Sequence, residues 1–439
     1  MQLRRSLGTF GLVFVIFFTV SGGAFTMEGL VASVGPGMAL LLLVVIPVVW
    51  ATPEALLIGE LSSMLPEEGG YYRWVHRAFG PFWAFQNGWL TWLYSLVDMA
   101  IYPVLFTTYL SWFMPGLNEW EKWALSLAMI WGATAINLRG AQRVGRVSIV
   151  AGLVVLGTFL AIALAAVPRM GHIPWHPFVP AGSSPLSTAG VGLSIVLWNY
   201  IGWDNASTVE GEIIDAGRTY PRALAFAVPM VTLAYLIPVT AALSASDWTT
   251  WREGGWPEIA HAVGGSFGGV LAPMVAVAGV ISALALFNAL LLAYSRVPAA
   301  MAEDGLLPRG LATTDERGTP RKAVLAAAGI YSVFALIPFS GLVVADVVFY
   351  AMALMLEFAA LITLRRKEPA LRGVFRVPVG TRGIIALALM PGVVLVGVIG
   401  LSLVGGRLSA GAIIGTMIGA ALGPVAYRFV TRASRATAA

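Results

Sequence analysis

Long apolar stretches, separated by short clusters of charged residues, glycine and proline, recur along the whole of this 439-residue chain. A helix needs about 20 apolar residues to cross the hydrocarbon core of a bilayer. Here 58% of the residues are hydrophobic and only 11% are charged, whereas soluble domains carry roughly 25% charged residues. The pattern excludes a soluble enzyme and a disordered assembly. It predicts an all-α polytopic membrane protein.

Hydropathy predicts twelve transmembrane helices. They cover residues 8–32, 37–63, 82–113, 120–138, 145–168, 188–211, 220–244, 267–296, 323–341, 343–364, 382–402 and 408–430. If the N-terminus is cytoplasmic, all but four of the 27 lysines and arginines lie in cytoplasmic segments. The exceptions are Lys122, Arg169, Arg252 and Arg407. This asymmetry predicts a multi-pass protein of the cytoplasmic membrane with both termini in the cytoplasm and an uncleaved first helix.

The chain lacks the residue patterns of common reactive sites. It has no cysteine, which excludes disulfides, thiol catalysis and cysteine-ligated metals. Motifs of zinc proteases, nucleotide-binding glycine loops and serine hydrolases are absent, so we predict neither an enzyme nor a cofactor. His172 and His176 lie in a proline-containing loop, where we expect no metal. We attribute the net charge of +5 to loop anchoring, not to a nucleic-acid partner.

Two predicted spans contain glycines in the middle of an apolar stretch. The first span has Ser21-Gly22-Gly23-Ala24-Phe25, and the sixth has Trp198-Asn199-Tyr200-Ile201-Gly202-Trp203-Asp204. Glycine costs about 1 kcal/mol in a helix interior, and backbone groups freed at bilayer depth need partners in a protein cavity. Close helix packing is the alternative explanation for a single glycine. Two such runs with similar tails, Thr26-Met27-Glu28-Gly29 and Thr208-Val209-Glu210-Gly211, favour two broken helices.

The two breaks lie in spans of opposite direction, which predicts an inverted repeat. We expect one five-helix repeat at residues 8–168, a second, inverted repeat at 188–364, and two additional helices at 382–430. The substrate is expected where the broken helices meet. The candidate binding residues are Ser21, Gly22, Gly23, Ala24, Phe25, Asp98, Trp198, Asn199, Tyr200, Ile201, Gly202 and Trp203. In the last span, Gly411, Gly415, Gly419 and Gly423 form a small-residue stripe, which predicts packing within the bundle or between protomers.

The spans also contain carboxyl groups but no central lysine or arginine. Those inside the spans are Glu54, Asp98, Asp204 and Glu357, with Glu60 and Asp346 nearer the ends. A charge at the bilayer centre costs roughly 3 kcal/mol or more, so each group is paired, protonated or next to a cavity. The negative surplus favours a site for protons or organic cations. Asp204 abuts the second break and is the candidate coupling residue; for Glu54, Asp98 and Glu357 a protonated structural role remains an alternative.

Several motifs, in this order and spacing, resemble the amino acid, polyamine and organocation superfamily of transporters. Over residues 10–380 they are Ser21 to Phe25, Gly59-Glu60-Leu61, Pro66 to Tyr71, Leu197 to Ser207, Pro221-Arg222-Ala223, Glu303 to Pro308 and Gly318-Thr319-Pro320. Residues 88–106 and 356–380 are most similar to the polyamine uptake and L-type amino acid transporter branch. The resemblance implies a fold of five plus five inverted helices with two extra helices, and alternating access. It also implies that Trp198 closes over the substrate and that Asp204 takes part in proton-linked gating. Some members of the superfamily have a lysine in the fifth helix that stands in for a sodium ion. The matching region of this chain has Gly152.

These features predict a secondary transporter that imports an organic amine, with protons as the coupling ion. Helix ends at the first break suit a carboxylate, and carbonyls at the second break suit an ammonium. A polyamine is slightly favoured as substrate, and a neutral or cationic amino acid transporter or exchanger is the alternative. A membrane receptor or scaffold on the same fold is a more distant alternative, because little chain follows the last predicted span. A channel is less favoured still, because broken helices around a closed site restrict continuous flow.

Overall fold

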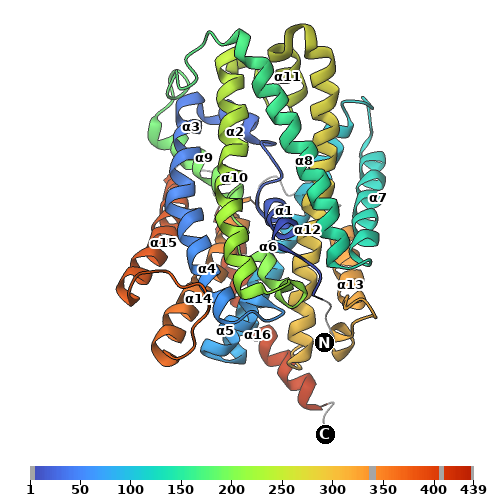
Figure 1. Ribbon diagram of the computed structural model, residues 1–439, viewed down its shortest axis with the longest axis vertical. Coiled ribbons are helices and arrows are strands. Elements are labelled where there is room, and N and C mark those ends of the chain that lie inside the picture. Colours follow the sequence, from blue (N-terminus) through green and yellow to red (C-terminus); the bar gives the residue numbers. More distant parts are fainter. Residues whose placement is uncertain (1–4, 336–342, 405–409, 437–439) are drawn as a thin grey trace.

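The computed structural model describes residues 5–335, 343–404 and 410–436. Within these ranges the chain is a bundle of long helices (Figure 1), and Leu7 and Ile213 form an isolated β-bridge. The α-helices are α1 (Thr9–Val20), α2 (Met27–Val34), α3 (Pro36–Ile46), α4 (Thr52–Met64), α5 (Gly70–Phe79), α6 (Pro81–Leu110), α7 (Glu119–Asn137), α8 (Ala141–Ala166), α9 (Pro185–Trp198), α10 (Ala216–Ala245), α11 (Trp256–Gly264), α12 (Gly268–Glu303), α13 (Arg321–Phe334), α14 (Val343–Lys367), α15 (Thr381–Val404) and α16 (Ala410–Ala436). A π-helix, η1 (Pro47–Ala51), joins α3 to α4, and the 3-10 helices are η2 (Val167–Arg169), η3 (Asn205–Glu212), η4 (Trp248–Thr250), η5 (Gly265–Phe267) and η6 (Arg309–Ala312).

Seven helical segments of the described residues are long and apolar enough to cross a membrane, by length and composition. They are Pro36–Met64, Pro81–Leu110, Ala141–Arg169, Ala216–Ala245, Trp256–Glu303, Val343–Lys367 and Thr381–Leu401. α1 and α9 are apolar but shorter, because each ends at a break. The prediction of an all-helical, multi-pass membrane protein is therefore confirmed, and the count of twelve spans stays a prediction. Parts of the spans expected at 323–341 and 408–430 lie outside the described residues.

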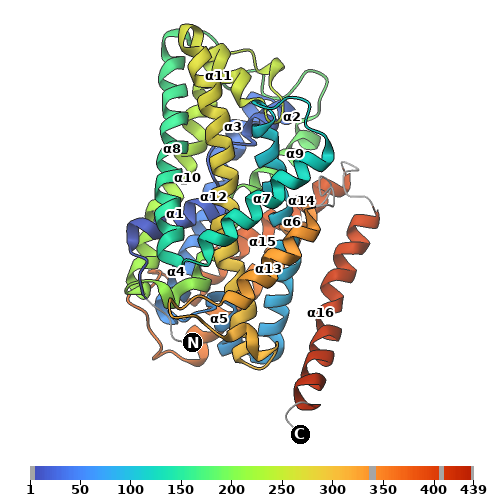
Figure 2. The same cartoon turned by 90° about the vertical axis from the view of Figure 1, so that its right-hand side faces the viewer.

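Both ends of the described chain lie at the same end of the bundle (Figures 1 and 2). An even number of crossings requires this arrangement. We refer to this end as the terminal end, and to the end that carries α11 as the opposite end. α6 packs extensively along α12, and α10 packs along α4. These four helices, with α1, α9 and α14, surround the two breaks.

α16 lies along the side of the bundle (Figure 2), next to α6 and α14. Its glycine stripe is part of this contact: a Cβ at Gly419 would lie 3.1 Å from Phe349 Cζ, and one at Gly423 would collide with Gln86. Trp89 Nε1 donates a hydrogen bond to Gly419 O (2.9 Å). The stripe therefore serves helix packing within the chain at these two positions. The side chain at 411 is outside the described part, and a contact between protomers stays a prediction.

Buried ion pairs connect helices at the terminal end of the bundle. Arg365 on α14 donates to both oxygens of Glu60 on α4, at 2.6 and 2.5 Å. The same guanidinium donates to Val377 O and Val379 O, and Glu60 also accepts from Val377 N. Because its charge is paired with that of Arg365 and both groups are hydrogen-bonded, the burial of Glu60 has a structural explanation. The sequence indicated only that Glu60 lies near the end of its span.

Both predicted helix breaks are present. α1 ends at Val20 and the helix resumes at Met27; between them, Gly22 and Gly23 have φ values of 70° and 102°. α9 ends at Trp198, and η3 begins at Asn205. Gly202, between them, has a φ of 102°. These positive φ values are accessible to glycine at little cost and strained for other residues, which explains the residue type at each break.

The two breaks lie against each other. Thr19 Oγ1 donates to Gly202 O (3.2 Å), and a Cβ added to Gly202 would collide with Thr19 O. Thr26 Oγ1 donates to Asn199 Oδ1 (3.0 Å). Backbone groups that leave the helical pattern are therefore satisfied partly by the other break, as a membrane interior requires.

We predict that Gly22→Ala lowers the unfolding temperature. A Cβ at Gly22 would lie 2.6 Å from Leu286 Cδ1 and 2.7 Å from Ser282 Oγ, at a φ of 70°. Overpacking of this kind costs about 1–3 kcal/mol. The matched control is Gly157→Ala in the middle of α8, where a Cβ meets nothing within 4 Å and alanine is the better helix former.

The measurement is thermal unfolding of both variants purified in the same detergent. The control should unfold at the wild-type temperature or above it. Equal unfolding temperatures for the two variants would contradict the break at Gly22.

Candidate functional site

Two small cavities lie where the breaks meet α6, α12 and α14. One, which we call the acidic cavity, is lined by Thr19, Val20, Tyr94, Asp98, Tyr102, Trp198, Ile201, Asn205, Tyr294, Asp346 and Tyr350. The other, which we call the neutral cavity, is lined by Val20, Ser21, Phe25, Thr26, Tyr102, Leu105, Trp198, Asn199 and Leu286. Each has room for about one water molecule. An organic ligand can therefore enter only after side chains move.

Asp98, on α6, is held by two tyrosine hydroxyls. It is 6% exposed, and its oxygens accept hydrogen bonds from Tyr102 (2.6 Å) and Tyr294 (2.9 Å). Tyr94 packs edge-on against both Tyr294 and Tyr350, so aromatic rings form much of the wall. Among the described residues, no lysine, arginine or histidine lines either cavity. A carboxylate beside aromatic rings, without a competing cation, suits an ammonium group.

Asp346, on α14, faces the same cavity. It is fully buried, and neither of its carboxyl oxygens has a hydrogen-bond partner in the described part of the chain. α14 packs along α6, which brings Asp346 close enough to Asp98 for their carboxyl groups to interact electrostatically. The sequence placed Asp346 only near the end of a predicted span. Its position beside Asp98 depends on a contact between two helices that are distant in the sequence.

Trp198 and Tyr102 separate the two cavities. Their rings stack with centroids 6.3 Å apart and an interplanar angle of 25°. Both residues line both cavities. Movement of this stacked pair would join the two cavities into one elongated space.

The predicted binding residues fall into two groups. Those that line a cavity are Ser21, Phe25, Asp98, Trp198, Asn199 and Ile201. Those that line neither cavity are Gly22, Gly23, Ala24, Tyr200, Gly202 and Trp203. The glycines of the first break serve close packing: a Cβ at Gly23 would lie 2.5 Å from Val155 Cγ1. Their role is to shape the backbone around the site.

The carbonyl groups of the second break mostly have donors within the protein. The hydrogen bonds run from Tyr235 Oη to Asn199 O (2.8 Å), from Trp203 Nε1 to Tyr200 O (2.8 Å), from Thr19 Oγ1 to Gly202 O (3.2 Å) and from Tyr220 Oη to Trp203 O (2.7 Å). The polar side chains on the neutral cavity are those of Ser21, Thr26, Tyr102, Trp198 and Asn199. A ligand there would meet side-chain groups more than backbone carbonyls, in contrast to the sequence-based expectation.

Tyr350, on α14, links the second break to two carboxyl groups. Its hydroxyl oxygen accepts a hydrogen bond from Gly202 N (2.9 Å). The same oxygen lies 2.6 Å from Asp204 Oδ1 and 2.5 Å from Glu54 Oε1. A hydroxyl has one hydrogen and can donate it to only one of the two carboxyl groups. The other contact requires a carboxyl proton, so this group of side chains holds at least one.

Glu357 adds a third carboxyl group beside Asp204. It accepts a hydrogen bond from Asn87 Nδ2 (3.4 Å). Glu54, Asp204 and Glu357, which we call the carboxyl cluster, are all 0–1% exposed. The buried arginines of the described residues, Arg296 and Arg365, pair with other carboxylates. Three buried carboxyl groups without a cation cannot all be ionised at reasonable cost.

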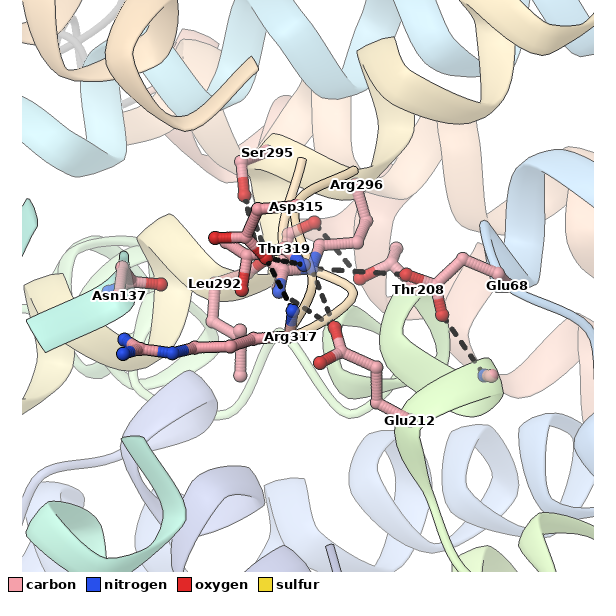
Figure 3. A network of polar contacts seen from close by, with 12 residues as sticks. Glu68, Asn137, Thr208, Glu212, Leu292, Ser295, Arg296, Asp315, Arg317 and Thr319 are labelled. Atoms are coloured by element: carbon pink, nitrogen blue, oxygen red, sulfur yellow. Dashed lines mark hydrogen bonds and ion pairs between the residues drawn. The ribbon is translucent and has the colours of Figure 1, made fainter. Parts of the chain in front are cut away.

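A buried ion pair closes the site towards the terminal end (Figure 3). Arg296 on α12 is fully buried and donates to Glu212 Oε1 from Nη2 (2.7 Å) and Nε (3.1 Å). Glu68 Oε1 lies 3.9 Å from Arg296 Nε, and Glu68 Oε2 accepts from Gly211 N (3.0 Å). The network joins α12 to the segment that follows the second break and to the chain before α5.

At the opposite end, α11 and the loop before it cover the first break. Trp256 Nε1 donates to Ala24 O (2.8 Å). Glu28 Oε1 accepts hydrogen bonds from Tyr109 Oη (3.0 Å) and Gly254 N (3.0 Å). Protein therefore covers the two cavities from both ends of the bundle.

A larger cavity of about 350 Å³ lies between α6, α12, α13 and α16. Its wall is apolar and contains no carboxyl group, and it shares only Tyr294 with the acidic cavity. It lacks the convergent polar groups expected of a specific site for a polar ligand. The acidic and neutral cavities are therefore the better candidates.

Comparison with known proteins identifies transporters as relatives of this chain. Residues 7–419 match the family model described as amino acid permease. Polyamine transporter PUT1 of rice (Oryza sativa subsp. japonica) is 36% identical over 392 residues, which cover 88% of this chain and 72% of the relative. Polyamine transporter RMV1 of Arabidopsis thaliana is 33% identical over 391 residues, covering 88% and 79%. The methylthioribose transporter of Bacillus subtilis (strain 168) is 26% identical over 401 residues, covering 86% and 85%. The family and these relatives are transporters and not enzymes, and the chain belongs to the amino acid permease family.

Proposed function

We propose that this protein is a secondary transporter that imports an organic amine, a polyamine in preference to an amino acid, with protons as the coupling ion. The acidic cavity carries the proposal: two buried carboxyl groups and several aromatic rings line it, and no basic side chain of the described residues does. Such a wall attracts an ammonium and repels a carboxylate. The names of the plant relatives support a polyamine as substrate.

We propose that the chain crosses the cytoplasmic membrane twelve times and that both of its termini lie in the cytoplasm. Residues 8–168 and 188–364 form the inverted repeats, and residues 382–430 form the two additional helices. The contacts support the repeat: α6 packs on α12 and α4 packs on α10. These are the third and second helices of each proposed repeat, and equivalent helices meet in this way around a pseudo-two-fold axis.

Alternating access follows from the two closures around the site. The Arg296 network closes the terminal end, and the contacts of Glu28 and Trp256 close the opposite end. Opening one closure at a time would expose the cavities to one side of the membrane. In this cycle Trp198, stacked on Tyr102 between the cavities, acts as the gating aromatic.

We place proton coupling in the carboxyl cluster, with Asp204 as its central member. The supporting observation is the shared hydroxyl of Tyr350, which requires a carboxyl proton on Glu54 or Asp204. Tyr350 also accepts from Gly202 N of the second break and lines the acidic cavity. Loss or gain of that proton would change the hydrogen bonding of the broken helix beside the substrate.

Transport of a neutral or cationic amino acid is the second candidate, and the neutral cavity favours it. This cavity adjoins the first break and offers hydroxyl and carboxamide groups from Ser21, Thr26 and Asn199. An amino acid could use these groups without the acidic cavity. The effect of replacing Asp98 distinguishes polyamine transport from amino acid transport.

We predict that Asp98→Asn raises the apparent KM for putrescine or spermidine by about 10- to 150-fold. Loss of one desolvated, charge-assisted contact weakens binding by roughly 1.5–3 kcal/mol, which corresponds to this factor. One of the hydroxyls of Tyr102 and Tyr294 can still donate to the carboxamide oxygen, and the other can accept from the carboxamide nitrogen, so the fold should persist. Uptake of labelled putrescine into proteoliposomes gives the KM.

The control for this substitution is Asp215→Asn, an exposed residue with a φ of 47°, a conformation that asparagine tolerates. Competition by neutral amino acids should change little in Asp98→Asn. Equal loss of all substrates, or of none, would favour the amino acid candidate and leave Asp98 a structural residue.

We predict that Asp204→Asn reduces accumulation driven by a pH gradient more than it reduces substrate exchange. The carboxamide cannot take up and release a proton, whereas exchange of labelled for unlabelled substrate needs only the conformational cycle. Tyr350→Phe should act in the same direction, because it removes the hydroxyl shared by Asp204 and Glu54.

Both variants are measured in the same liposomes, with and without an imposed pH gradient, so that exchange serves as the internal control. Full gradient-driven accumulation in Asp204→Asn would assign coupling to another residue.

A further inference from the structure

Asp346 has no structural partner that accounts for its burial. It is 0% exposed, and both carboxyl oxygens lack hydrogen bonds to any described residue. By contrast, each other carboxyl group of the acidic cavity and the carboxyl cluster has at least one oxygen with a partner: Asp98 has two tyrosine hydroxyls, Asp204 and Glu54 share Tyr350, and Glu357 has Asn87. An unpaired buried carboxyl group is costly for folding. Such a group is therefore a candidate for binding something that the protein itself does not supply.

The surroundings of Asp346 select a cation. Asp346 and Asp98 line the same cavity and interact electrostatically, and Tyr102 and Tyr294 lie close to both. The hydroxyl hydrogens of these two tyrosines are donated to Asp98, so none is directed at Asp346. A cation with several donor hydrogens could bridge the two carboxylates. The aromatic wall favours an organic ammonium over a small, strongly hydrated metal ion.

The neutral cavity completes an elongated site. It continues from the acidic cavity across the stacked Tyr102 and Trp198 and carries no carboxylate. The wall between the cavities is aromatic and aliphatic, since Val20 also lines both. Once the stacked pair moves, an apolar chain could pass between these side chains. The hydroxyl of Ser21 and the carboxamide of Asn199 are among the polar groups of the neutral cavity.

We propose that Asp346 and Asp98 together form a subsite that holds one terminal ammonium of a diamine, while the methylene chain passes Trp198 and Tyr102 and the other amine occupies the neutral cavity. The inference rests on the proposed function, and it assigns Asp346 as the residue that makes the site select a cationic end. A substrate with a carboxylate at that end is rejected, because it would face two like charges at short range.

The test compares putrescine with hexanedioate, which has the same four methylene groups but a carboxylate at each end. The purified protein is studied as wild type, Asp346→Asn, Asp346→Glu, Asp98→Asn, the double variant Asp98→Asn/Asp346→Asn, and the control Asp215→Asn. Affinities are measured by inhibition of labelled putrescine uptake and by the rise in unfolding temperature on addition of each compound.

Asp346→Asn is expected to weaken putrescine binding by about 10- to 150-fold and to leave hexanedioate binding unchanged or stronger. Asp346→Glu keeps the charge and should retain the preference for putrescine. Because both carboxylates hold the same ammonium, the double variant should lose less than the product of the two single losses. Without ligand, Asp346→Asn should unfold no lower than the wild type, since it removes no protein hydrogen bond.

Unchanged selectivity in Asp346→Asn would overturn the inference. So would equal weakening of both compounds, or a lower unfolding temperature without ligand, since each assigns Asp346 a structural role. A wild-type protein that transports putrescine while Asp346→Asn behaves normally refutes only this subsite. A wild-type protein that neither transports nor binds putrescine refutes the proposed function itself.

Discussion

The structure depends on the need to satisfy backbone groups where two helices stop inside an apolar bundle. A membrane interior supplies no water for these groups, so the protein must provide their partners. Thr19 of the first break donates to the carbonyl of Gly202 in the second, and neighbouring helices add the hydroxyl of Tyr235 and the indole of Trp256. Tightly packed polar groups are therefore unavoidable at the centre of the molecule. The cavities, the aromatic wall and the unpaired carboxyl groups surround this centre.

Charge pairing separates structural carboxylates from candidate functional ones. Glu60 and Glu212 each form an ion pair with a buried arginine, and both lie near the terminal end. Asp98, Asp204 and Asp346 are also buried, and the buried arginines in the described part of the chain pair with other carboxylates. In a low-dielectric interior, a carboxylate paired with an arginine holds helices together. A carboxyl group without such a cation persists only if a proton or a ligand neutralises it. On this division rests our proposal of a ligand in the acidic cavity and a proton in the carboxyl cluster.

Much of this arrangement could be predicted from the sequence because it depends on local residue patterns. The apolar stretches predicted a multi-pass helical protein, and glycines at 22, 23 and 202 predicted the breaks. Asp98 was singled out because no basic residue lies in its span, and Asp204 because it abuts the second break. Short amphipathic helices such as α5 were not predicted, because hydropathy averages over windows longer than they are.

The remaining features depend on contacts between distant parts of the chain. Asp346 joins Asp98 only because α14 packs on α6, and Tyr350 reaches Gly202 and Glu54 only through the same helix. The glycines of the first break also lie close to Leu286 and Val155, and their predicted backbone contact with the substrate stays a prediction. Sequence periodicity gives the face of a helix but not its neighbour. Such assignments therefore required the three-dimensional structure.

The central claim is that the acidic cavity binds an organic cation and that the carboxyl cluster carries the coupled proton. Reconstitution into liposomes, with a panel of labelled amines and amino acids measured with and without an inward pH gradient, tests it most directly. The account predicts that putrescine or spermidine accumulates, that the gradient increases this accumulation, and that neutral amino acids compete weakly. Uptake of neutral amino acids alone, indifferent to polyamines and to the gradient, would contradict it.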